Sequence, residues 1–597
     1  MGNFYKDNDD IRFLLENMDL GTLANFMEEG FRFANQFDFA PADGAEAAEN
    51  YKLVMDSLGK LCAEVVAPRS EAMDRASNKL TEDGKVIRPE GMYEILDKMS
   101  KAQLMGMTLP HRFGGLNFPS LILSVANEMV SRGDASLMNI FGLQGIAETI
   151  NSFASEEIKQ EYLYDLCDGK TTGAMVLTEP DAGSDLQACK VKAFQDASGQ
   201  WYLNGVKRFI TNGCGEVLLV MARSEADRSG GLGLSLFVCG QGPTVHIRRL
   251  EDKMGIHASP TCEIFFDNTP CKLVGERQRG LVTYVMALMN GARVGISAQG
   301  IGIGEAAYRV ARDYAASREQ FGGPIEKLPA VRDLLIDMKI AVEESRALLY
   351  ETCRIVDHEV GYYKITEGEG YTDEQKKDAK KAQRMIKRYA AMLTPMSKYI
   401  STEMANKVAS DAIQVLGGSG FMRDYPCERY YRDARITNIY EGTTQLQVVA
   451  AVRGVNNGTA EKYIEELATT FQYDDSVKDL LAILAENTKL MNSCVEFIKD
   501  KGIDYMDLYG RDLVDIAVKI ICGYLFCQQA SAKNDMMTAV DNNGTKVSMK
   551  ARKAKIARRY ITKNNPRMTA WATSIKSGDT SSFESYNELA GAVPVLS

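Results

Sequence analysis

Hydrophobic residues recur every three or four positions through residues 51–170, which predicts an N-terminal domain built from helices. The segment YKLVMDSLGKLCAEVVAP is expected to end its helix at Pro68, because proline interrupts a helix. Residues 121–153 predict two helices broken near Gly133, and residues 156–170 predict an amphipathic helix.

The pattern changes near residue 171. Short runs rich in Val, Ile, Phe and Thr alternate with Gly, Asn and Asp, which predicts seven or eight strands between residues 171 and 280. The segment ASGQWYLNG within this region predicts a hairpin. The middle of the chain is therefore expected to be a β domain.

Helical spacing returns at residue 281, and four helices are expected before residue 456. The charged residues 364–380 within this region are expected to form an exposed loop. Together the patterns predict an α+β multidomain protein, whose expected parts are listed in chain order: a helical leader at 1–50, an N-terminal helical domain at 51–170, a middle β-barrel-like domain at 171–280, a C-terminal four-helix domain at 281–456, and an extra C-terminal helical domain at 457–597.

Composition narrows the classes of function. With 597 residues, the chain is too long for one hydrophobic core, and its net charge of −10 argues against a nucleic-acid binder. Four dispersed histidines and twelve scattered cysteines without a CxxC pair argue against a metal site and favour reduced thiols. We find no signal peptide and no long apolar window, so we expect a cytoplasmic protein without a transmembrane helix.

Two segments of the β domain carry candidate chemistry. LTEPDAGSDL (177–186) runs from a strand into a turn whose N–H groups can face a heteroaromatic ring or a phosphate, although an ordinary β-turn also fits. FITNG (209–213) fits a half-buried strand with a type I′ turn, or an aromatic wall and a hydroxyl beside a flavin.

Two further segments lie in the predicted C-terminal helices. SREQFGGPI (317–325) carries Arg318, which can bind a pyrophosphate or cap a helix. IQVLGGSGF (413–421) fits a glycine-rich helix end or a close approach to a dinucleotide, but it is not a Rossmann fingerprint.

The segment IYEGTTQLQ (439–447) is the most informative one. Glu441 on a short apolar loop can have its pKa raised by desolvation, which suits a general base. Gly442 permits an unusual backbone angle, and Thr443 can cap the following helix. The alternative is that Glu441 is a first-turn residue favoured by the helix dipole.

These five segments, in this order on a helical–β–helical chain, resemble the acyl-CoA dehydrogenase family over residues 50–455. The resemblance implies FAD bound between the middle domain and the C-terminal helices. The implied cofactor contacts are Leu177, Thr178, Ser184, Phe209, Ile210 and Thr211 on the flavin side, Arg318, Gln320, Phe321, Gln414, Gly417 and Gly418 donated to a neighbouring subunit, and Thr443 and Gln445 at the ADP half.

The same resemblance implies a substrate site and names the base as Glu441. The implied acyl-CoA contacts are Ser184, Asn290, Arg293, Tyr440 and Gly442. The sequence departs from the family where Asp is frequent at the position of Asn290, where Trp is commoner than Phe209, and where Pro329 replaces a glutamine. Some relatives carry the base in the segment matching 290–293, which here has no carboxylate.

The implied reaction is abstraction of the acyl α-proton by Glu441 with transfer of the β-hydride to flavin N5, which gives a trans-2-enoyl-CoA. The thioester carbonyl would accept hydrogen bonds from the Glu441 N–H and a ribityl hydroxyl, and an electron-transfer flavoprotein would take the electrons. The alternatives are an acyl-CoA oxidase, a specialised methylthiopropionyl-CoA-like dehydrogenase, and a non-catalytic scaffold, which the retained Glu441 disfavours.

Residues 457–597 resemble the extra helical domain of longer family members, which implies a homodimer. The run 546–567 contains nine Lys/Arg and no acid. It fits a solvated helix face or a peripheral contact with an anionic membrane.

Overall fold

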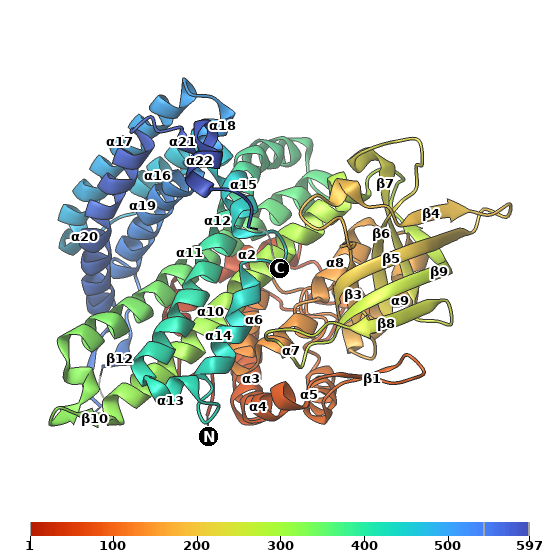
Figure 1. Ribbon diagram of the computed structural model, residues 1–597, viewed down its shortest axis with the longest axis horizontal. Helices are drawn as coiled ribbons and strands as arrows, with labels where there is room; N and C mark the ends of the chain where they lie inside the picture. The colour runs from red at the N-terminus through yellow and green to blue at the C-terminus, as the bar shows by residue number, and fades with distance from the viewer. Residues whose placement is uncertain (1, 541–543, 595–597) are drawn as a thin grey trace. The chain divides into compact units, whose positions relative to one another are not determined.

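The computed structural model describes residues 2–540 and 544–594. The chain forms two compact units, one of Met1–Ala390 with Ser397–Thr444 and the other of Ala391–Met396 with Gln445–Ser597. The first unit contains the N-terminal helices, the β domain and long C-terminal helices, and the second is helical (Figure 1).

Nine helices and two π- or 3₁₀-helical turns lie among the described residues before the β domain. The helices are α1 (Asp9–Asn17), α2 (Leu20–Met27), α3 (Gly44–Leu61), α4 (Ala67–Ala76), α5 (Glu90–Lys101), α6 (Ser120–Gly133), α7 (Ala135–Phe141), α8 (Gln144–Phe153) and α9 (Glu156–Asp168). A short hairpin of β1 (Lys79–Leu80) and β2 (Val86–Ile87) joins α4 to α5. Gly169 ends α9 in the left-handed conformation, as expected for a helix C-terminus.

Two helix boundaries differ from the sequence prediction. The helix expected to end at Pro68 continues, because a π-helical turn at Cys62–Val66 leads into α4 and places Pro68 in the first turn, where its missing N–H is tolerated. The two helices expected in 121–153 are three. Asp134 is extended and accepts a hydrogen bond from the Leu137 N–H at 2.8 Å, which starts α7, and a second break follows at Gly142.

The β domain is a closed seven-stranded sheet, which confirms the barrel-like expectation. Its strands are β3 (Gly173–Val176), β4 (Lys192–Gln195), β5 (Trp201–Thr211), β6 (Val217–Arg223), β7 (Leu234–Gly240), β8 (Val245–Leu250) and β9 (Thr261–Val274). Their order is β3-β6-β4-β5-β9-β7, with β8 on β9, and the pairing of β7 with β6 closes the sheet. Strands β4 and β5 form the predicted hairpin.

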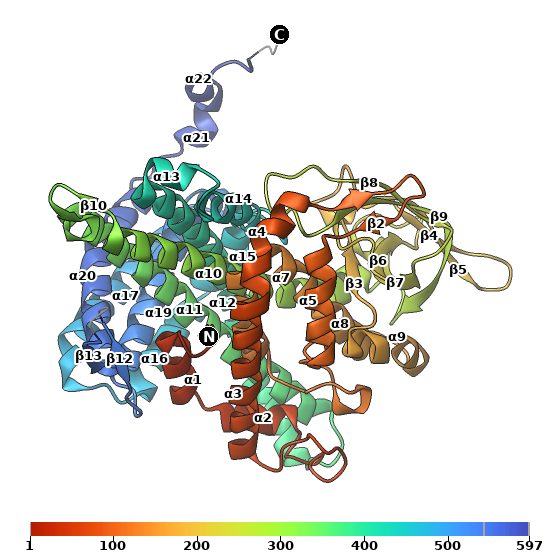
Figure 2. The same cartoon turned by 90° about the horizontal axis from the view of Figure 1, so that it is seen from below.

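The first six residues of β6 are all buried, although their side chains alternate between the two faces of the sheet. Leu218 and Val220 point into the barrel core, whereas Leu219 and Met221 pack outward in a cluster with Ile146 of α8. Strand β6 is therefore covered on both faces, and Figure 2 shows α8 and α9 beside the barrel.

Long helices follow the β domain along the chain. They are α10 (Met286–Ser317), α11 (Pro329–Glu367), α12 (Asp373–Leu416), the short α13 (Gly418–Phe421) and α14 (Cys427–Thr437). Gly302 of α10 lies so close to α6 that a Cβ there would be 2.4 Å from the Glu128 carbonyl oxygen. The glycines of α10 thus allow two backbones to approach.

The prediction of an exposed, charged loop at 364–380 is wrong for most of these residues, which are helical. Helix α11 continues to Glu367, and α12 begins at Asp373 with a capping box between Thr372 and Gln375. Only residues 368–372 are non-helical, because lysine, glutamate and glutamine are good helix formers that also tolerate solvent on every side.

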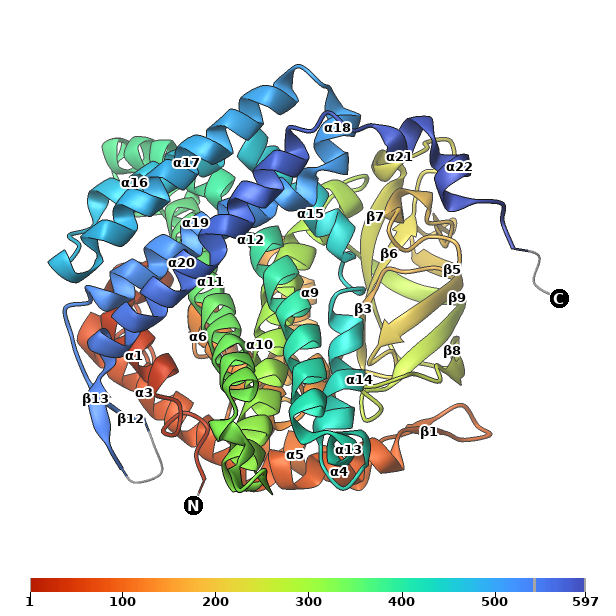
Figure 3. The same ribbon diagram turned by 60° about the vertical axis from the view of Figure 1, so that its left-hand side comes forward.

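The second unit packs apolar α19 (Gly510–Ala530) against α17 (Lys478–Lys499) and α20 (Met549–Ile575), as Figure 3 shows. Its other elements are α15 (Thr444–Asn456), α16 (Thr459–Thr470), α18 (Ile503–Leu508), β12 (Met537–Ala539), β13 (Lys546–Ser548), α21 (Ser581–Glu584) and α22 (Tyr586–Ala590). Rings of Phe526 and Tyr560 meet edge to face at 5.0 Å between α19 and α20.

Several basic residues of the 546–567 run are engaged within this unit. Arg558 forms two hydrogen bonds with Asp479, Lys550 lies 3.3 Å from an Asp474 oxygen, and Lys553 is fully buried. The buried Lys553 departs from a solvated helix face, whereas the exposed Arg558 fits it, and contact with an anionic membrane stays a prediction.

Two helical stretches among the described residues are long and apolar enough to span a membrane by length and composition. They are Gly280–Ser317, whose apolar window is 44% buried, and Gly510–Ala530, whose window is 83% buried. Buried core helices pass the same test, so length and composition do not assign these segments to a membrane.

Candidate active site

A β-bulge near the end of β5 places Phe209 at the edge of the candidate site. The pairing of β5 with β9 shifts register between Lys207 and Ile210, and Phe209 takes a positive φ of 61°. Such a bulge redirects a side chain. It leaves the Phe209 ring 51% exposed, while Ile210 stays buried. The type I′ turn at 212–213 is not formed, because Asn212 has a positive φ and Gly213 does not.

A buried ion pair anchors the segment that carries Leu177 and Thr178. Lys207 of β5 is fully buried, its Nζ lies 2.9 Å from Glu179 Oε1, and it donates to the Leu177 carbonyl at 2.6 Å. The Arg208 N–H donates to the Thr178 carbonyl at 2.9 Å. These bonds fix LTEPDAGSDL beside the bulged end of β5.

The Glu441 loop lies between α14 and α15. Glu441 and Gly442 both have positive φ angles, of 56° and 94°. A left-handed glutamate is uncommon and costs free energy, so the surrounding structure must hold it. Tyr440 helps to do so, because its hydroxyl donates to Asn139 Oδ1 at 3.2 Å and also to Gln299.

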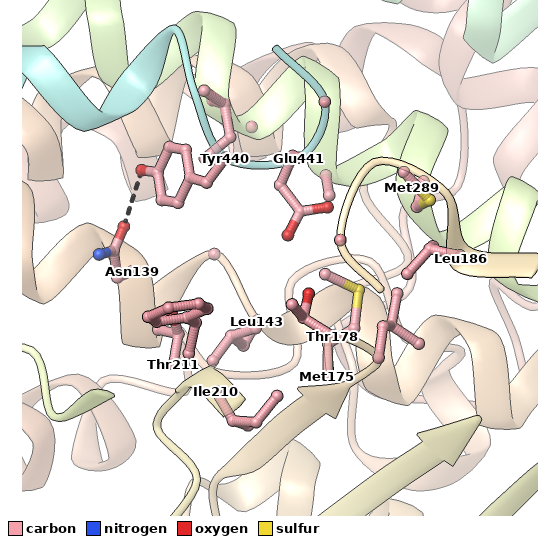
Figure 4. A pocket seen from close by; sticks show the side chains of 18 of the residues that line it. Asn139, Leu143, Met175, Thr178, Leu186, Ile210, Thr211, Met289, Tyr440 and Glu441 are labelled. Atoms are coloured by element: carbon pink, nitrogen blue, oxygen red, sulfur yellow. Dashed lines mark hydrogen bonds between the residues drawn. The ribbon is translucent and has the colours of Figure 1, made fainter. Parts of the chain in front are cut away.

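The electrostatics of Glu441 suit a proton acceptor. Burial raises the pKa of its carboxyl to about 7, and the nearby cations Lys398 and Arg293 oppose that rise. A carboxylate with a pKa near neutrality can take a proton and is still ionised in a useful fraction of molecules. The carboxyl group points into a pocket with largely apolar walls (Figure 4).

This pocket brings together eight of the site residues predicted from the sequence. Strands β3 and β5, helices α7 and α10, and the Glu441 loop contribute its walls. The predicted residues among its lining are Leu177, Thr178, Phe209, Ile210, Thr211, Tyr440, Glu441 and Gly442. Segments about 230 residues apart in the chain thus meet at one carboxylate.

Three predicted substrate residues lie outside this lining. Ser184 and Asn290 are exposed, and Arg293 is half-buried and donates to Asn290 Oδ1 at 3.0 Å. Arg293 remains electrostatically close to Glu441, which raises the pKa of the guanidinium against the larger lowering by burial.

The predicted contacts to a neighbouring subunit are exposed. Strands β10 (Glu319–Gln320) and β11 (Gly323–Pro324) form a tight hairpin whose two turn residues, Phe321 and Gly322, both have positive φ. Phe321 at the tip is 92% exposed. Arg318, Gln320, Gln414, Gly417 and Gly418 are exposed as well.

The two groups of exposed residues belong to neighbouring helix ends. Tyr314 in the last turn of α10 reaches toward Ser419 Oγ, with its hydroxyl at 3.4 Å, and its ring lies edge-on to Tyr425 at 5.6 Å. Thr443 is half-buried before α15, and Gln445 is an exposed residue of the second unit.

The sequence analysis missed Asn139 and Gln299, which hold Tyr440, and the buried Lys398 of α12. No motif marks the two amides, because only folding brings α7 and α10 to the tyrosine hydroxyl. Lys398 had a weak signal: it is a charged residue on the apolar face of a helix.

A helical–barrel–helical chain with a buried carboxyl group that faces a largely apolar pocket fits a flavin-dependent dehydrogenase of acyl thioesters. Comparison with known families agrees. The acyl-CoA dehydrogenase N-terminal domain matches residues 48–170, the middle domain matches 174–269, and the C-terminal domain matches 279–365 and 375–455.

Individual relatives extend the comparison. A 3-methylmercaptopropionyl-CoA dehydrogenase of Ruegeria pomeroyi is 32% identical over 456 residues, which are 71% of this chain and 74% of that one. A chain from a structure described as the electron transferring flavoprotein of Acidaminococcus fermentans is 31% identical, with a TM-score of 0.59, over 68% of this chain and 98% of that one. An acyl-CoA dehydrogenase of Bacillus anthracis complexed with FAD shares the fold over 92% of each chain, with a TM-score of 0.71 and 22% identity.

The chain belongs to the acyl-CoA dehydrogenase family. It is an oxidoreductase, and FAD is the cofactor of this family. The residues fit that cofactor. The exposed rings of Phe209 and Phe321 offer flat apolar surfaces, and a Cβ at Gly417 or Gly418 would meet no atom within 4 Å.

Proposed function

We propose that the protein oxidises an acyl-CoA to the trans-2-enoyl-CoA with Glu441 as the base that removes the α-proton. The observation that carries the proposal is the Glu441 carboxyl itself. It points into a pocket beside the flavin-side segments, and its pKa is raised by burial to about 7. An acyl α-C–H is a weak acid, so the base must be held close and the developing negative charge must be stabilised.

The backbone of the same loop supplies that stabilisation. The Glu441 N–H is assigned to donate to the thioester carbonyl, where negative charge develops as the proton leaves. The largely apolar walls around the carboxyl exclude water and strengthen this hydrogen bond.

The remaining predicted residues position the cofactor. Leu177, Thr178 and the Phe209–Thr211 strand end would hold the flavin ring, and Arg318 with Phe321 would hold the diphosphate and adenine of a neighbouring subunit's FAD. When bound, FAD accepts the β-hydrogen of the substrate with its electron pair. We infer a homodimer, because the residues around Phe321 are exposed within a single chain.

Two finer assignments accompany the proposal. An electron-transfer flavoprotein is the inferred electron acceptor, supported by the 31% identical chain from a structure described with that name. The 3-methylmercaptopropionyl-CoA relative makes a short, sulfur-containing acyl chain one substrate to include in any survey.

The decisive experiment is anaerobic bleaching of the purified yellow holoenzyme by acyl-CoAs of different length and branching, with 3-methylmercaptopropionyl-CoA among them. Glu441→Gln should retain FAD and lose flavin reduction by about 10²- to 10⁴-fold, the range for a removed general base. Glu156→Gln, an exposed carboxylate paired with Arg112, is the matched control and should reduce normally.

Reduction of the Glu441→Gln flavin at the wild-type rate would contradict the assignment of the base. Absence of bleaching by every acyl-CoA would contradict the proposed function. Rapid oxygen consumption without reduction of an electron-transfer flavoprotein would identify an oxidase instead.

A further inference from the structure

Lys398 is a charged side chain in a place where charge is costly. It lies in the middle of α12 and is fully buried. Burial lowers the pKa of its amine, and Arg293 lowers it further, whereas the carboxylates Glu441 and Glu403 favour the charged form. An isolated buried ammonium destabilises a fold, so a lysine in this position needs a compensating role.

The Lys398 side chain reaches the loop that carries the base. Its Nζ donates to the Gly442 carbonyl oxygen at 2.8 Å. That carbonyl belongs to the peptide that joins Gly442 to Thr443, directly after the two residues of positive φ, Glu441 and Gly442. The bond therefore fixes the orientation of the strained turn that aims both the Glu441 carboxyl and its N–H.

The charges around Glu441 are few among the described residues. Lys398 approaches from α12 and Arg293 from α10, and both favour the ionised carboxyl. Glu403, one turn and a half along α12 from Lys398, accepts a hydrogen bond from the Thr444 hydroxyl at 2.6 Å and favours the charged amine. Tyr440 precedes the base, and its hydroxyl is held by Asn139 and Gln299.

We propose that Lys398 is a positioning residue that holds the Glu441–Gly442 turn through the Gly442 carbonyl and, by its charge, keeps the Glu441 carboxyl ready to accept a proton. This role rests on the proposed function of Glu441 as the base. It assigns to α12 a part in positioning the proposed base, in addition to its packing. Arg293 shares the electrostatic part, and Lys398 adds the hydrogen bond to the Gly442 carbonyl.

The test compares uncharged variants at position 398 in the FAD-loaded protein. Lys398→Met keeps the length of the side chain but removes the charge and the donor, and Lys398→Gln removes the charge and keeps a polar group. Lys364→Met is the matched control, because Lys364 is also a lysine of lowered pKa that donates to a backbone carbonyl, that of Met27 at 3.0 Å, and it does not line the pocket.

The first readout needs no substrate. Infrared difference titration, with Glu441→Gln used to identify the carboxyl band, reports the pKa of Glu441. Both Lys398 variants should raise that pKa by about one unit, since a nearby opposite charge is removed. Lys364→Met should leave it unchanged.

The second readout is the pH profile of flavin reduction by the best acyl-CoA. The wild-type rate should rise with pH through about 7, as the carboxyl ionises. If the pKa of Glu441 rises by about one unit, both Lys398 variants should reduce the flavin roughly fivefold more slowly at pH 7. The rate should recover at higher pH, where the carboxyl is ionised again. Lys398→Met should also show a lower plateau, because the turn loses its hydrogen bond and the base is misaligned.

An unchanged Glu441 pKa in a Lys398 variant that retains FAD would overturn the proposal. Loss of FAD or of folding in both variants, with Lys364→Met normal, would show that Lys398 serves the fold and would overturn it as well. Since the infrared titration uses no substrate, failure of this proposal is distinguishable from failure of the proposed function, which shows as absence of bleaching in the wild-type protein.

Discussion

At the residue scale, Glu441 joins two properties that oppose stability. Its backbone is left-handed, and its carboxyl is buried enough to raise its pKa to about 7. Both features are costly in a fold and useful in a base, which is the pattern expected where function rather than stability sets the residue. The left-handed backbone is held by contacts of its neighbours: Lys398 with the Gly442 carbonyl, and two buried amides with the Tyr440 hydroxyl.

The raised pKa makes a prediction about stability and pH. Below about pH 4.5 the carboxyl is protonated in both the folded and the unfolded chain. Between that value and about 7 the unfolded chain ionises while the folded chain keeps its proton, so the wild-type protein loses stability as the pH rises. Glu441→Gln should therefore unfold at a higher temperature than the wild type at pH 8 and at a similar temperature at pH 4.

Thermal unfolding of both holoproteins across this pH range measures the effect. A constant difference between the two proteins at all pH values would contradict the raised pKa. Glu156→Gln again serves as control and should show no gain at pH 8, since that carboxyl is exposed and paired.

At the scale of elements, close helix contact and a buried charge cluster hold the first unit together. Arg346 of α11 is fully buried and pairs with Asp10 of α1, Glu128 of α6 and Glu305 of α10, at 2.5, 2.7 and 3.0 Å. Asp10 links the leader to this cluster. Helix α10 contributes to the cluster, to the pocket wall and to the close contact with α6, so its placement affects all three.

Gly302→Ala should destabilise the protein by about 1–3 kcal/mol, the usual cost of overpacking, because the added methyl group meets backbone atoms of α6. Gly291→Ala lies in the same helix, meets nothing within 4 Å, and should be neutral or stabilising. Denaturant-induced unfolding of both variants measures the difference. Equal stability of the two variants would argue against close packing of α10 on α6.

At the scale of the whole molecule, the exposed Phe321 hairpin predicts assembly. Within one chain this ring has little to contact, since it is 92% exposed at the tip of a two-residue turn. The proposed dimer gives it the adenine end of a neighbouring subunit's FAD. Sedimentation of the holoenzyme should give twice the 66.0 kDa of one chain.

Phe321→Ala should keep the fold and weaken FAD binding by tenfold or more, the loss expected for about 1.4 kcal/mol of stacking and burial. Phe583→Ala, an exposed phenylalanine of the second unit, is the control and should retain FAD. Measured FAD content after gel filtration compares them. Full retention by Phe321→Ala, or a monomer mass for the wild type, would contradict the assigned role.

The sequence by itself determined the order of helical, β and helical parts, and it singled out the Glu441 segment, because periodicity and local motifs depend on neighbouring residues. It left the number of strands between seven and eight, and the barrel has seven. It misplaced the boundary at Pro68 and the loop at 364–380, since a π-helical turn and solvated charges are tolerated in ways that residue type alone does not show. Only the tertiary structure decided which residues meet. The closure of the barrel, the bulge that exposes Phe209 and the contact of Lys398 with Gly442 depend on atoms far apart in the chain, and burial, which sets the pKa of Glu441, is a property of the packed fold.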